Sequence, residues 1–108
     1  MGKIEIKISA NGEFSWVLKG FQNTILVTSS LFKTEKECRK SIEQFLNSNQ
    51  ELQFHKKVSK HGNLFFEQVD KDGKKLCKSK NYQSELALEL AIRSLKTLTE
   101  DAPIVSTF

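Results

Sequence analysis

The chain has 108 residues and a mass of 12.4 kDa, the size of one domain. Hydrophobic residues make up 38% and charged residues 28%, a globular composition that excludes intrinsic disorder. The net charge of +4 divides evenly between the two halves, whereas nucleic-acid-binding proteins usually concentrate their positive charge. No apolar run could span a bilayer, and the charged N-terminus does not resemble a secretory signal. We therefore expect a cytoplasmic protein without membrane association.

The first half of the chain predicts three strands. Residues 3–8 alternate apolar and polar side chains, which is the period of a half-buried strand. The pair Asn11-Gly12 that follows is typical of a type I′ hairpin turn. Alternation resumes at residues 14–18, and after a short break a third strand is expected at residues 24–28.

The hydrophobic period then changes from that of a strand to that of a helix. Thr34 and Glu37 are spaced as a capping box, in which the Thr34 hydroxyl accepts from the Glu37 amide and the Glu37 side chain reaches back. The predicted buried stripe of this helix consists of Cys38, Ile42, Phe45 and Leu46.

The second half predicts the same elements in the same order. Its strands are expected at residues 52–58, 63–69 and 74–78, with a turn at His61-Gly62 between the first two. Because the same three strands and turn recur, the second half reads as a copy of the first.

A second helix closes this half. Ser84 is its expected N-cap, and the helix should end near Thr99, before Pro103. Residues 104–108 could add a short terminal strand. The predicted buried stripe of this helix consists of Leu88, Ala91, Ile92 and Leu95.

The two halves align at an offset of 50 residues without a gap from Ile4 to Leu46. Identical residues occupy both copies at Lys7/Lys57, Ser9/Ser59, Gly12/Gly62, Leu26/Leu76, Ser29/Ser79, Glu35/Glu85 and Ile42/Ile92. Most other core substitutions keep their chemistry, as Trp16 against Phe66 does.

This alignment predicts an α+β domain built of two tandem βββα(β) repeats, residues 1–50 and 51–108. One copy is too small to bury its own apolar face, so the copies should pack with pseudo-twofold symmetry. We expect one antiparallel sheet with two helices packed on one face, and a monomeric pseudo-dimer.

The residues resemble the YegP-like family of small bacterial proteins. The resemblance rests on the runs at residues 11–19, 29–34 and 38–43, on their counterpart at residues 79–84, and on the tail at 101–105. It covers nearly the whole chain. The sequence departs from the family pattern at residues 18–23 and at Lys40-Ser41-Ile42, which marks a divergent member.

The resemblance implies tandem units that form one sheet and exchange their C-terminal strands. It implies no activity, because the family has no established biochemical function, and no functional residue is carried over from it.

The sequence contains few candidates for catalytic residues. It contains no motif of a metalloprotease, a serine hydrolase, or a nucleotide-binding loop. The two histidines are expected in exposed positions, His55 on a strand and His61 in a turn. Cys38 and Cys77 align with Leu88 and Val27, so we interpret both as core residues rather than nucleophiles or disulfide partners. We therefore expect no enzyme, no cofactor and no metal.

Two features suggest a binding surface. The lysines Lys74, Lys75, Lys78 and Lys80 cluster on the third strand of the second copy and at its exit. Phe65 is out of phase with its buried neighbours and should face away from the helices. The favoured interpretation is an interaction or accessory module with an unknown protein partner; the alternative is weak nucleic-acid binding by these residues.

Overall fold

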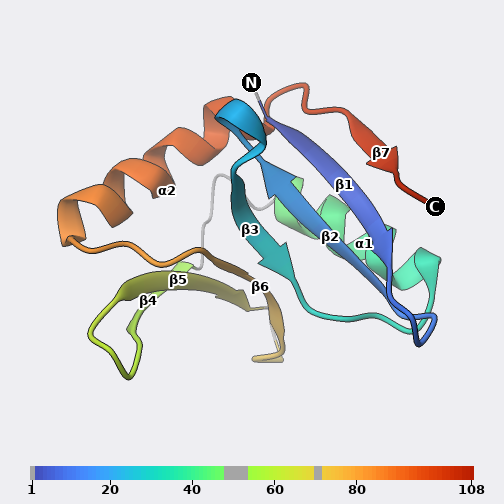
Figure 1. Cartoon of the computed structure of the whole chain (residues 1–108), viewed down its shortest axis with the longest axis horizontal. Helices are drawn as coiled ribbons and strands as arrows, with labels where there is room; N and C mark the ends of the chain where they lie inside the picture. Colours follow the sequence, from blue (N-terminus) through green and yellow to red (C-terminus); the bar gives the residue numbers. More distant parts are fainter. Residues whose placement is uncertain (1, 48–53, 70–71) are drawn as a thin grey trace.

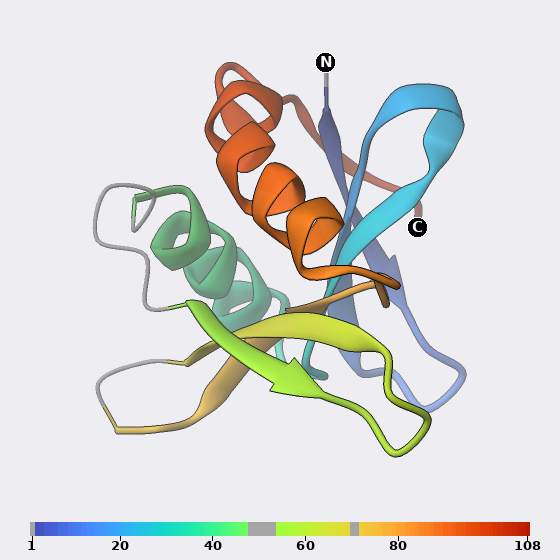
Figure 2. The ribbon, with the colours of Figure 1, turned by 90° about the vertical axis from the view of Figure 1, so that its left-hand side faces the viewer.

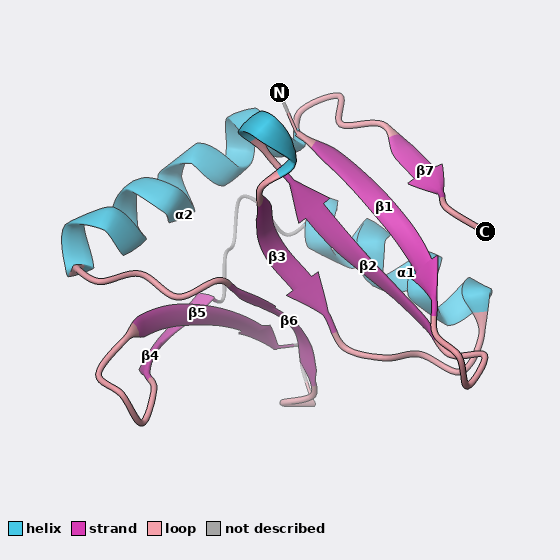
Figure 3. Ribbon diagram, viewed as in Figure 1, coloured by secondary structure: helices cyan, strands magenta, loops and turns pink. Residues whose placement is uncertain are grey.

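The computed structural model describes residues 2–47, 54–69 and 72–108. Seven strands form one sheet in the order β4-β5-β6-β3-β2-β1-β7, accompanied by two α-helices (Figures 1 and 3). In chain order the elements are β1 (Lys3–Ile8), β2 (Phe14–Lys19), the 3-10 turn η1 (Phe21–Asn23), β3 (Ile25–Ser29), α1 (Glu35–Asn47), β4 (Phe54–Val58), β5 (Leu64–Val69), β6 (Lys75–Ser79), α2 (Glu85–Thr99) and β7 (Ile104–Ser106). Neither described α-helix meets the length and apolarity that crossing a membrane requires.

Apart from η1, which lies where the sequence indicated only a break, the element types and their order agree with the sequence prediction, and most bounds differ by a residue or two. The predicted strand at 52–58 begins at Phe54 in the structure, while Leu52 and Gln53 lie outside the described residues. The predicted terminal strand is shorter than expected and ends at Ser106.

The expectation of a purely antiparallel sheet is wrong, because β7 runs parallel to β1. The Ile4 N–H donates to Pro103 O at 2.9 Å, and the Thr107 N–H donates to Ile6 O at 3.0 Å. Helix α2 returns the chain to the end of the sheet where β1 begins (Figure 1). The strand that follows α2 therefore runs in the same direction as β1, and the sheet is mixed.

Both helices lie on the concave side of the twisted sheet (Figure 2). Helix α1 packs on β2 and α2 on β5, and one hydrophobic cluster joins the two halves. Trp16 packs against Phe45 with ring centroids 4.9 Å apart, and Phe66 packs against Phe54 at 4.6 Å. The buried members of the cluster are Ile4, Ile6, Trp16, Leu18, Val27, Phe32, Cys38, Ile42, Phe45, Phe66, Cys77, Leu88 and Leu95.

Most residues of the predicted helix stripes are buried, and those at the sides of each stripe, seen around the helix axis, are only partly buried. Cys38, Ile42 and Phe45 are buried in α1, as are Leu88 and Leu95 in α2. The remaining stripe residues are only partly buried: Leu46, Ala91 and Ile92.

The helix caps follow the sequence prediction. The Glu37 N–H donates to Thr34 Oγ1 and the Ala87 N–H to Ser84 Oγ, both at 3.1 Å. The Glu37 carboxylate reaches back and accepts from the Thr34 hydroxyl. Each hydroxyl thus satisfies one of the amides that a helix start leaves without an intrahelical acceptor.

The prediction of a type I′ turn between β1 and β2 is wrong. Only Gly12 of the expected pair has a positive φ, of 80°, whereas type I′ requires it of Asn11 as well. The Gly12 N–H donates to Ser9 O at 3.0 Å, and the Ser9 N–H donates to Glu13 O at 2.8 Å, which closes a three-residue loop. The Ser9 hydroxyl stabilises this longer loop by accepting from the Asn11 and Glu13 amides.

The second hairpin repeats this geometry around Gly62, whose φ is 81°. The Gly62 N–H donates to Ser59 O at 3.0 Å, and the Ser59 N–H to Asn63 O at 2.8 Å. The sequence pattern of this three-residue loop thus includes the serine that precedes it as well as the glycine.

One buried hydrogen bond distinguishes the first half from the second. The Trp16 indole N–H donates to Ser41 Oγ at 2.8 Å inside the core, and the Ser41 hydroxyl donates to Cys38 O. At the aligned positions the second half has Phe66 and Ala91, which have no polar side-chain atom to satisfy. The hydroxyl is therefore present where the indole requires an acceptor.

This bond predicts a coupled pair of substitutions. Ser41→Ala leaves the buried indole N–H without an acceptor and should lower the free energy of unfolding by about 1–3 kcal/mol. Trp16→Phe together with Ser41→Ala recreates the combination of the second half and should cost less than the two single costs summed. Urea unfolding of the four proteins measures both effects, and strictly additive costs would contradict the coupling.

Candidate functional site

The face of the sheet opposite the helices, called the outer face here, carries most of the candidate residues. On β5, Phe66 points into the core, so its neighbours Phe65 and Glu67 point outward. The strand register sets Phe65 opposite Lys57 of β4 and Glu67 opposite Lys78 of β6. The outer cluster is defined as Lys57, Phe65, Glu67, Lys75 and Lys78.

The aromatic centre of the outer cluster is Phe65, which is half-buried. Lys78 Nζ lies 5.1 Å from the centroid of its ring. A cation over an aromatic face contributes about 0.5–1 kcal/mol at an exposed site. The ammonium group therefore covers one face of the ring and holds positive charge beside it.

Glu67 is the acidic centre of the outer cluster and is only 8% exposed. Its carboxylate lies 3.2 Å from Lys75 Nζ and 3.5 Å from Lys57 Nζ. Burial by itself would raise the pKa of Glu67, but hydrogen bonds and charge from Lys75 and Lys57 outweigh it and hold the pKa below the ordinary value. Three lysines and one carboxylate leave the outer cluster with a net charge of 3 − 1 = +2.

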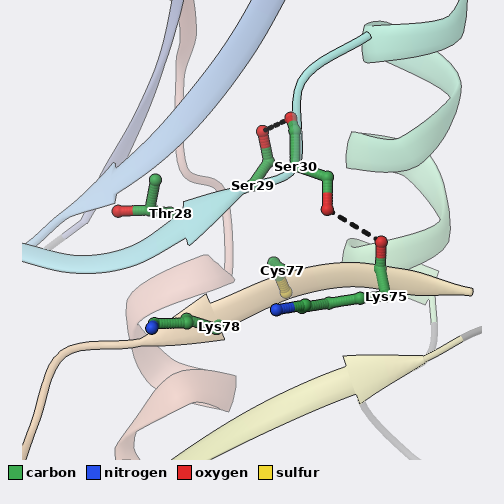
Figure 4. Close-up of a pocket in the computed structure, with 6 residues that line it drawn as sticks. All are labelled: Thr28, Ser29, Ser30, Lys75, Cys77 and Lys78. Carbon is green, nitrogen blue, oxygen red and sulfur yellow. Dashed lines mark hydrogen bonds between the residues drawn. The ribbon is translucent and has the colours of Figure 1, made fainter.

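A pocket of about 180 Å³ lies beside the outer cluster, where β3 of the first half meets β6 of the second. Ser30 Oγ donates to Lys75 O at 2.8 Å across this junction, and Ser29 Oγ donates to Ser30 O (Figure 4). Six residues line the pocket: Thr28, Ser29, Ser30, Lys75, Cys77 and Lys78. Its wall therefore combines hydroxyl groups from one half with cationic side chains from the other.

The thiol in this pocket is suited to packing rather than to nucleophilic chemistry. Burial raises the pKa of Cys77 to about 12, and its Sγ lies 3.6 Å from Gln68 Oε1. Burial likewise raises the pKa of Cys38 to about 11. The thiolate is the reactive form of cysteine, so both groups are unreactive near neutral pH. Both cysteines are free, as the sequence predicted.

The burial of both thiols predicts how they react. Neither Cys38 nor Cys77 should be modified by an aromatic disulfide reagent while the protein is folded, because both are at most 1% exposed. Modification should accelerate with urea in step with the loss of tryptophan fluorescence. Fast labelling of one thiol at native conditions, with the unfolded chain as the full-reactivity reference, would contradict this.

The structure brings together three of the five residues singled out from the sequence. Phe65, Lys75 and Lys78 belong to the outer cluster, and Lys75 and Lys78 also line the pocket. Lys80 lies elsewhere, with its Nζ 5.4 Å from the Tyr82 ring, and Lys74 sits in the connection before β6.

Sequence reasoning missed Glu67, Lys57 and the serines of the first half. A signal for Glu67 was present, because it replaces the apolar Val17 of the aligned copy. Ser29 and Ser30 gave no such signal, since only the pairing of β3 with β6 places them beside the lysines.

The histidines lie where the sequence predicted. His55 on β4 and His61 in the β4–β5 turn are both exposed. Among residues 2–47, 54–69 and 72–108, no group of three or more acidic, histidine or cysteine side chains is arranged to hold a metal ion.

The lowered pKa of Glu67 predicts a pH dependence of stability. Because its folded pKa lies below the unfolded value, Glu67 stabilises the fold above the unfolded pKa, near 4.5, and this contribution is lost as the pH falls through the folded pKa. Glu67→Gln should remove it and flatten the stability curve between about pH 5 and pH 3. Unfolding by urea across this range measures the difference, and parallel curves for the two proteins would contradict the assignment.

Glu5 provides the matched control on the outer face of the first half. Hydrogen bonds from Lys19 and then Lys3, at 3.0 and 3.1 Å, lower its pKa. Glu5→Gln should flatten the same acidic range without changing the outer cluster.

No protein-family model matches the sequence, and no curated protein matches it significantly. Two structures solved by NMR in solution share its fold. YegP of E. coli, described as a protein of unknown function, superimposes with a TM-score of 0.89 at 22% identity over 98% of this chain and 92% of that chain. The UPF0339 protein SO3888 of Shewanella oneidensis superimposes with a TM-score of 0.88 at 24% identity over 97% and 90%.

These likenesses confirm the YegP-like fold that the sequence resemblance implied. At this level of identity they show the fold alone, and they give no support to nucleic-acid binding.

Proposed function

We propose that the chain is a divergent YegP-like protein that acts as a non-catalytic interaction module, with the outer cluster as its binding surface. In this proposal it is a cytoplasmic, bacterial, monomeric pseudo-dimer of two tandem units, residues 1–50 and 51–108. The observation that carries it is the net positive outer cluster, grouped around Phe65 on a sheet face that neither helix covers.

The pairing of β3 with β6 supports the pseudo-twofold relation between the units. Ser29 pairs with Cys77, and Val27 pairs with Ser79; an offset of 50 converts each pair into the other. The Ser30 N–H donates to Leu76 O, and the Lys80 N–H to Leu26 O, at 3.1 and 3.0 Å, and these bonds interchange in the same way. The local axis would pass at the remaining pair, Thr28 with Lys78.

The chemistry of the described side chains supports a non-catalytic role. Both thiols are held in the protonated form by burial, and both histidines lie exposed, away from the pocket. The pocket offers serine hydroxyls that donate to backbone carbonyls, and none of its six named lining residues is a histidine or a carboxylate that could activate them.

The charge of the outer cluster supports one class of partner. Glu67 neutralises one of the three lysines, so an incoming surface would meet two excess positive charges beside an aromatic ring. Interfaces commonly bury an aromatic anchor within a rim of charged groups. We therefore infer that the partner is a protein with an acidic contact surface.

Nucleic-acid binding is the alternative that the same residues suggested from the sequence. Single-stranded nucleic acid stacks its bases on open aromatic faces. Here Lys78 covers a face of Phe65, so that face is not open for a base to stack on. The observed geometry therefore favours a protein partner over stacked bases.

Site-specific photo-crosslinking tests the binding surface. A benzophenone side chain replacing His55, which is exposed next to the outer cluster, should capture a partner in cells, whereas one replacing Leu86 on α2 should not. The adduct should disappear when Lys75→Glu and Lys78→Glu are combined.

The matched control for that charge reversal is Lys36→Glu with Lys40→Glu, on the exposed side of α1. It changes the net charge equally and should leave the adduct unchanged. If both charge reversals abolish the adduct equally, or if only position 86 captures a protein, the proposed surface is wrong.

A mixed-sequence oligonucleotide tests the alternative. We expect no binding at physiological salt. Binding that weakens steeply with salt and is lost when Lys74, Lys75 and Lys78 become Glu would instead establish a nucleic-acid surface.

A further inference from the structure

The two edges of the sheet are not equivalent. At one edge β7 covers β1, whereas at the other β4 is the last strand. Within the part of the chain that the structure describes, β4 pairs only with β5. Its outer side therefore presents backbone groups to which no described strand is bonded.

The register identifies those backbone groups. The pairs of β4 with β5 match those of β1 with β2 at the offset of 50 residues, as Ile6 with Trp16 matches Lys56 with Phe66. In β1 it is the Ile4 N–H and the Ile6 carbonyl that bond to the β7 segment. Because backbone groups alternate in direction along a strand, Phe54 and Lys56 present the corresponding groups of β4 outward.

The repeat length explains why no described strand covers this edge. Shifted by 50 residues, the terminal segment 104–108 falls on residues 54–58, and so does the β1 segment 4–8. Residues 54–58 thus correspond both to β1 and to the terminal segment. In the structure they form β4, which pairs with β5 as β1 pairs with β2 and is therefore the second-half equivalent of β1. The sheet has a position for an eighth strand beside β4 that no second segment of the described residues fills.

The surroundings of β4 define what a strand there would contact. Val105 of β7 lies beside Glu5, whose counterpart on β4 is His55, and the next outward position lies beside Lys57. Both positions border the outer cluster, with its net charge of +2. Acidic side chains on the outward positions of an added strand would therefore be favoured.

On the side that faces the helices, the β4 edge differs from the β7 edge. At the β7 edge, Arg39 of α1 donates to Ser106 Oγ at 3.2 Å. Its counterpart on α2 is Glu89, whose carboxylate binds Lys56 Nζ at 2.7 Å. On the helix side of β4, the charges of Lys56 and Glu89 already neutralise each other. The positions of an added strand that face the outer cluster therefore decide whether acidic or basic side chains are preferred.

We propose that the β4 edge is an acceptor for an extended acidic peptide, which adds as a parallel strand in the way that β7 adds to β1. The inference rests on the proposed function, for which it supplies the partner class and the binding mode. A second copy of the chain is a poorer occupant, because joining two β4 edges would bring Lys56 and Lys57 of one copy against those of the other, and like charges across strands are destabilising.

The probes for this proposal derive from the chain itself. One peptide has the sequence of residues 102–108 with Val105→Glu and Thr107→Glu; the other has Val105→Lys and Thr107→Lys. In the register of β7 both changes point to the outer face. The glutamate peptide should bind the whole protein about tenfold more tightly than the lysine peptide. On its addition, the NMR chemical-shift changes of the protein's backbone amides should centre on β4.

Substitutions at Lys56 separate the edge from the outer face. Lys56→Pro removes the outward N–H, which an edge strand tolerates, and should abolish binding of the glutamate peptide. Lys56→Ala loses the same ion pair with Glu89 but keeps the N–H, and should bind normally. Lys57→Glu, which leaves every backbone group in place and brings the net charge of the outer cluster to zero, should abolish the preference between the two peptides.

The outcomes distinguish failure of the inference from failure of the proposed function. Binding that survives Lys56→Pro, or shifts that centre on β1 or on the side chains of the outer cluster, would overturn strand addition at β4 while leaving the outer cluster a binding surface. Equal binding of the two peptides, no binding of either, or self-association of the chain through β4 would also overturn the inference. The proposed function is judged separately, by the crosslink from position 55 and its loss on charge reversal.

Discussion

The pairing of β3 with β6 is the constraint on which the rest of the structure depends. Together with the pairing of β7 with β1, it joins the two halves within the sheet, and it does so through the Ser30–Leu76 and Lys80–Leu26 backbone bonds. Because a small unit has too little apolar surface to stabilise itself, each half needs the other to complete its interior. The junction also sets the serines of the first half against the lysines of the second and thereby creates the pocket.

The two halves use one backbone plan for different chemistry. The first half places Ile6, Val17 and Leu18 at positions where the second has Lys56, Glu67 and Gln68. Polar groups in a buried environment require partners, and the buried Glu67 finds its partners in Lys57 and Lys75, while the exposed Lys56 pairs with Glu89. The first half thus contributes more of the apolar core, whereas the second holds the charged surface that the proposed function uses.

Much of the fold could be predicted from the sequence, because it depends on local patterns. Alternation located the strands, and hydroxyl spacing located the start of each helix. The hairpin type was not predictable from Asn11-Gly12, since the Ser9 hydroxyl stabilises a longer loop than that pair alone favours. The direction of β7 was not predictable either, because it follows from where α2 delivers the chain.

The candidate site was predictable only in part. Composition and phase identified Phe65, Lys75 and Lys78, all on adjacent strands of one half. The ion pairs of Glu67 and the pocket depend on register and on contact between halves, which no single segment encodes. Lys80 is close to Lys78 in sequence, yet it lies over Tyr82 instead of joining the outer cluster.

The distribution of fluorophores has a practical consequence. The chain contains one tryptophan and one tyrosine, and they fall in different halves. Trp16 is fully enclosed and bonded to Ser41, while Tyr82 bridges to Leu64 and is partly enclosed. Excitation at wavelengths that only tryptophan absorbs therefore reports on the first half of an unlabelled molecule, and comparing its change with that of the backbone signal of the whole chain can reveal whether the halves lose their structure together or in succession.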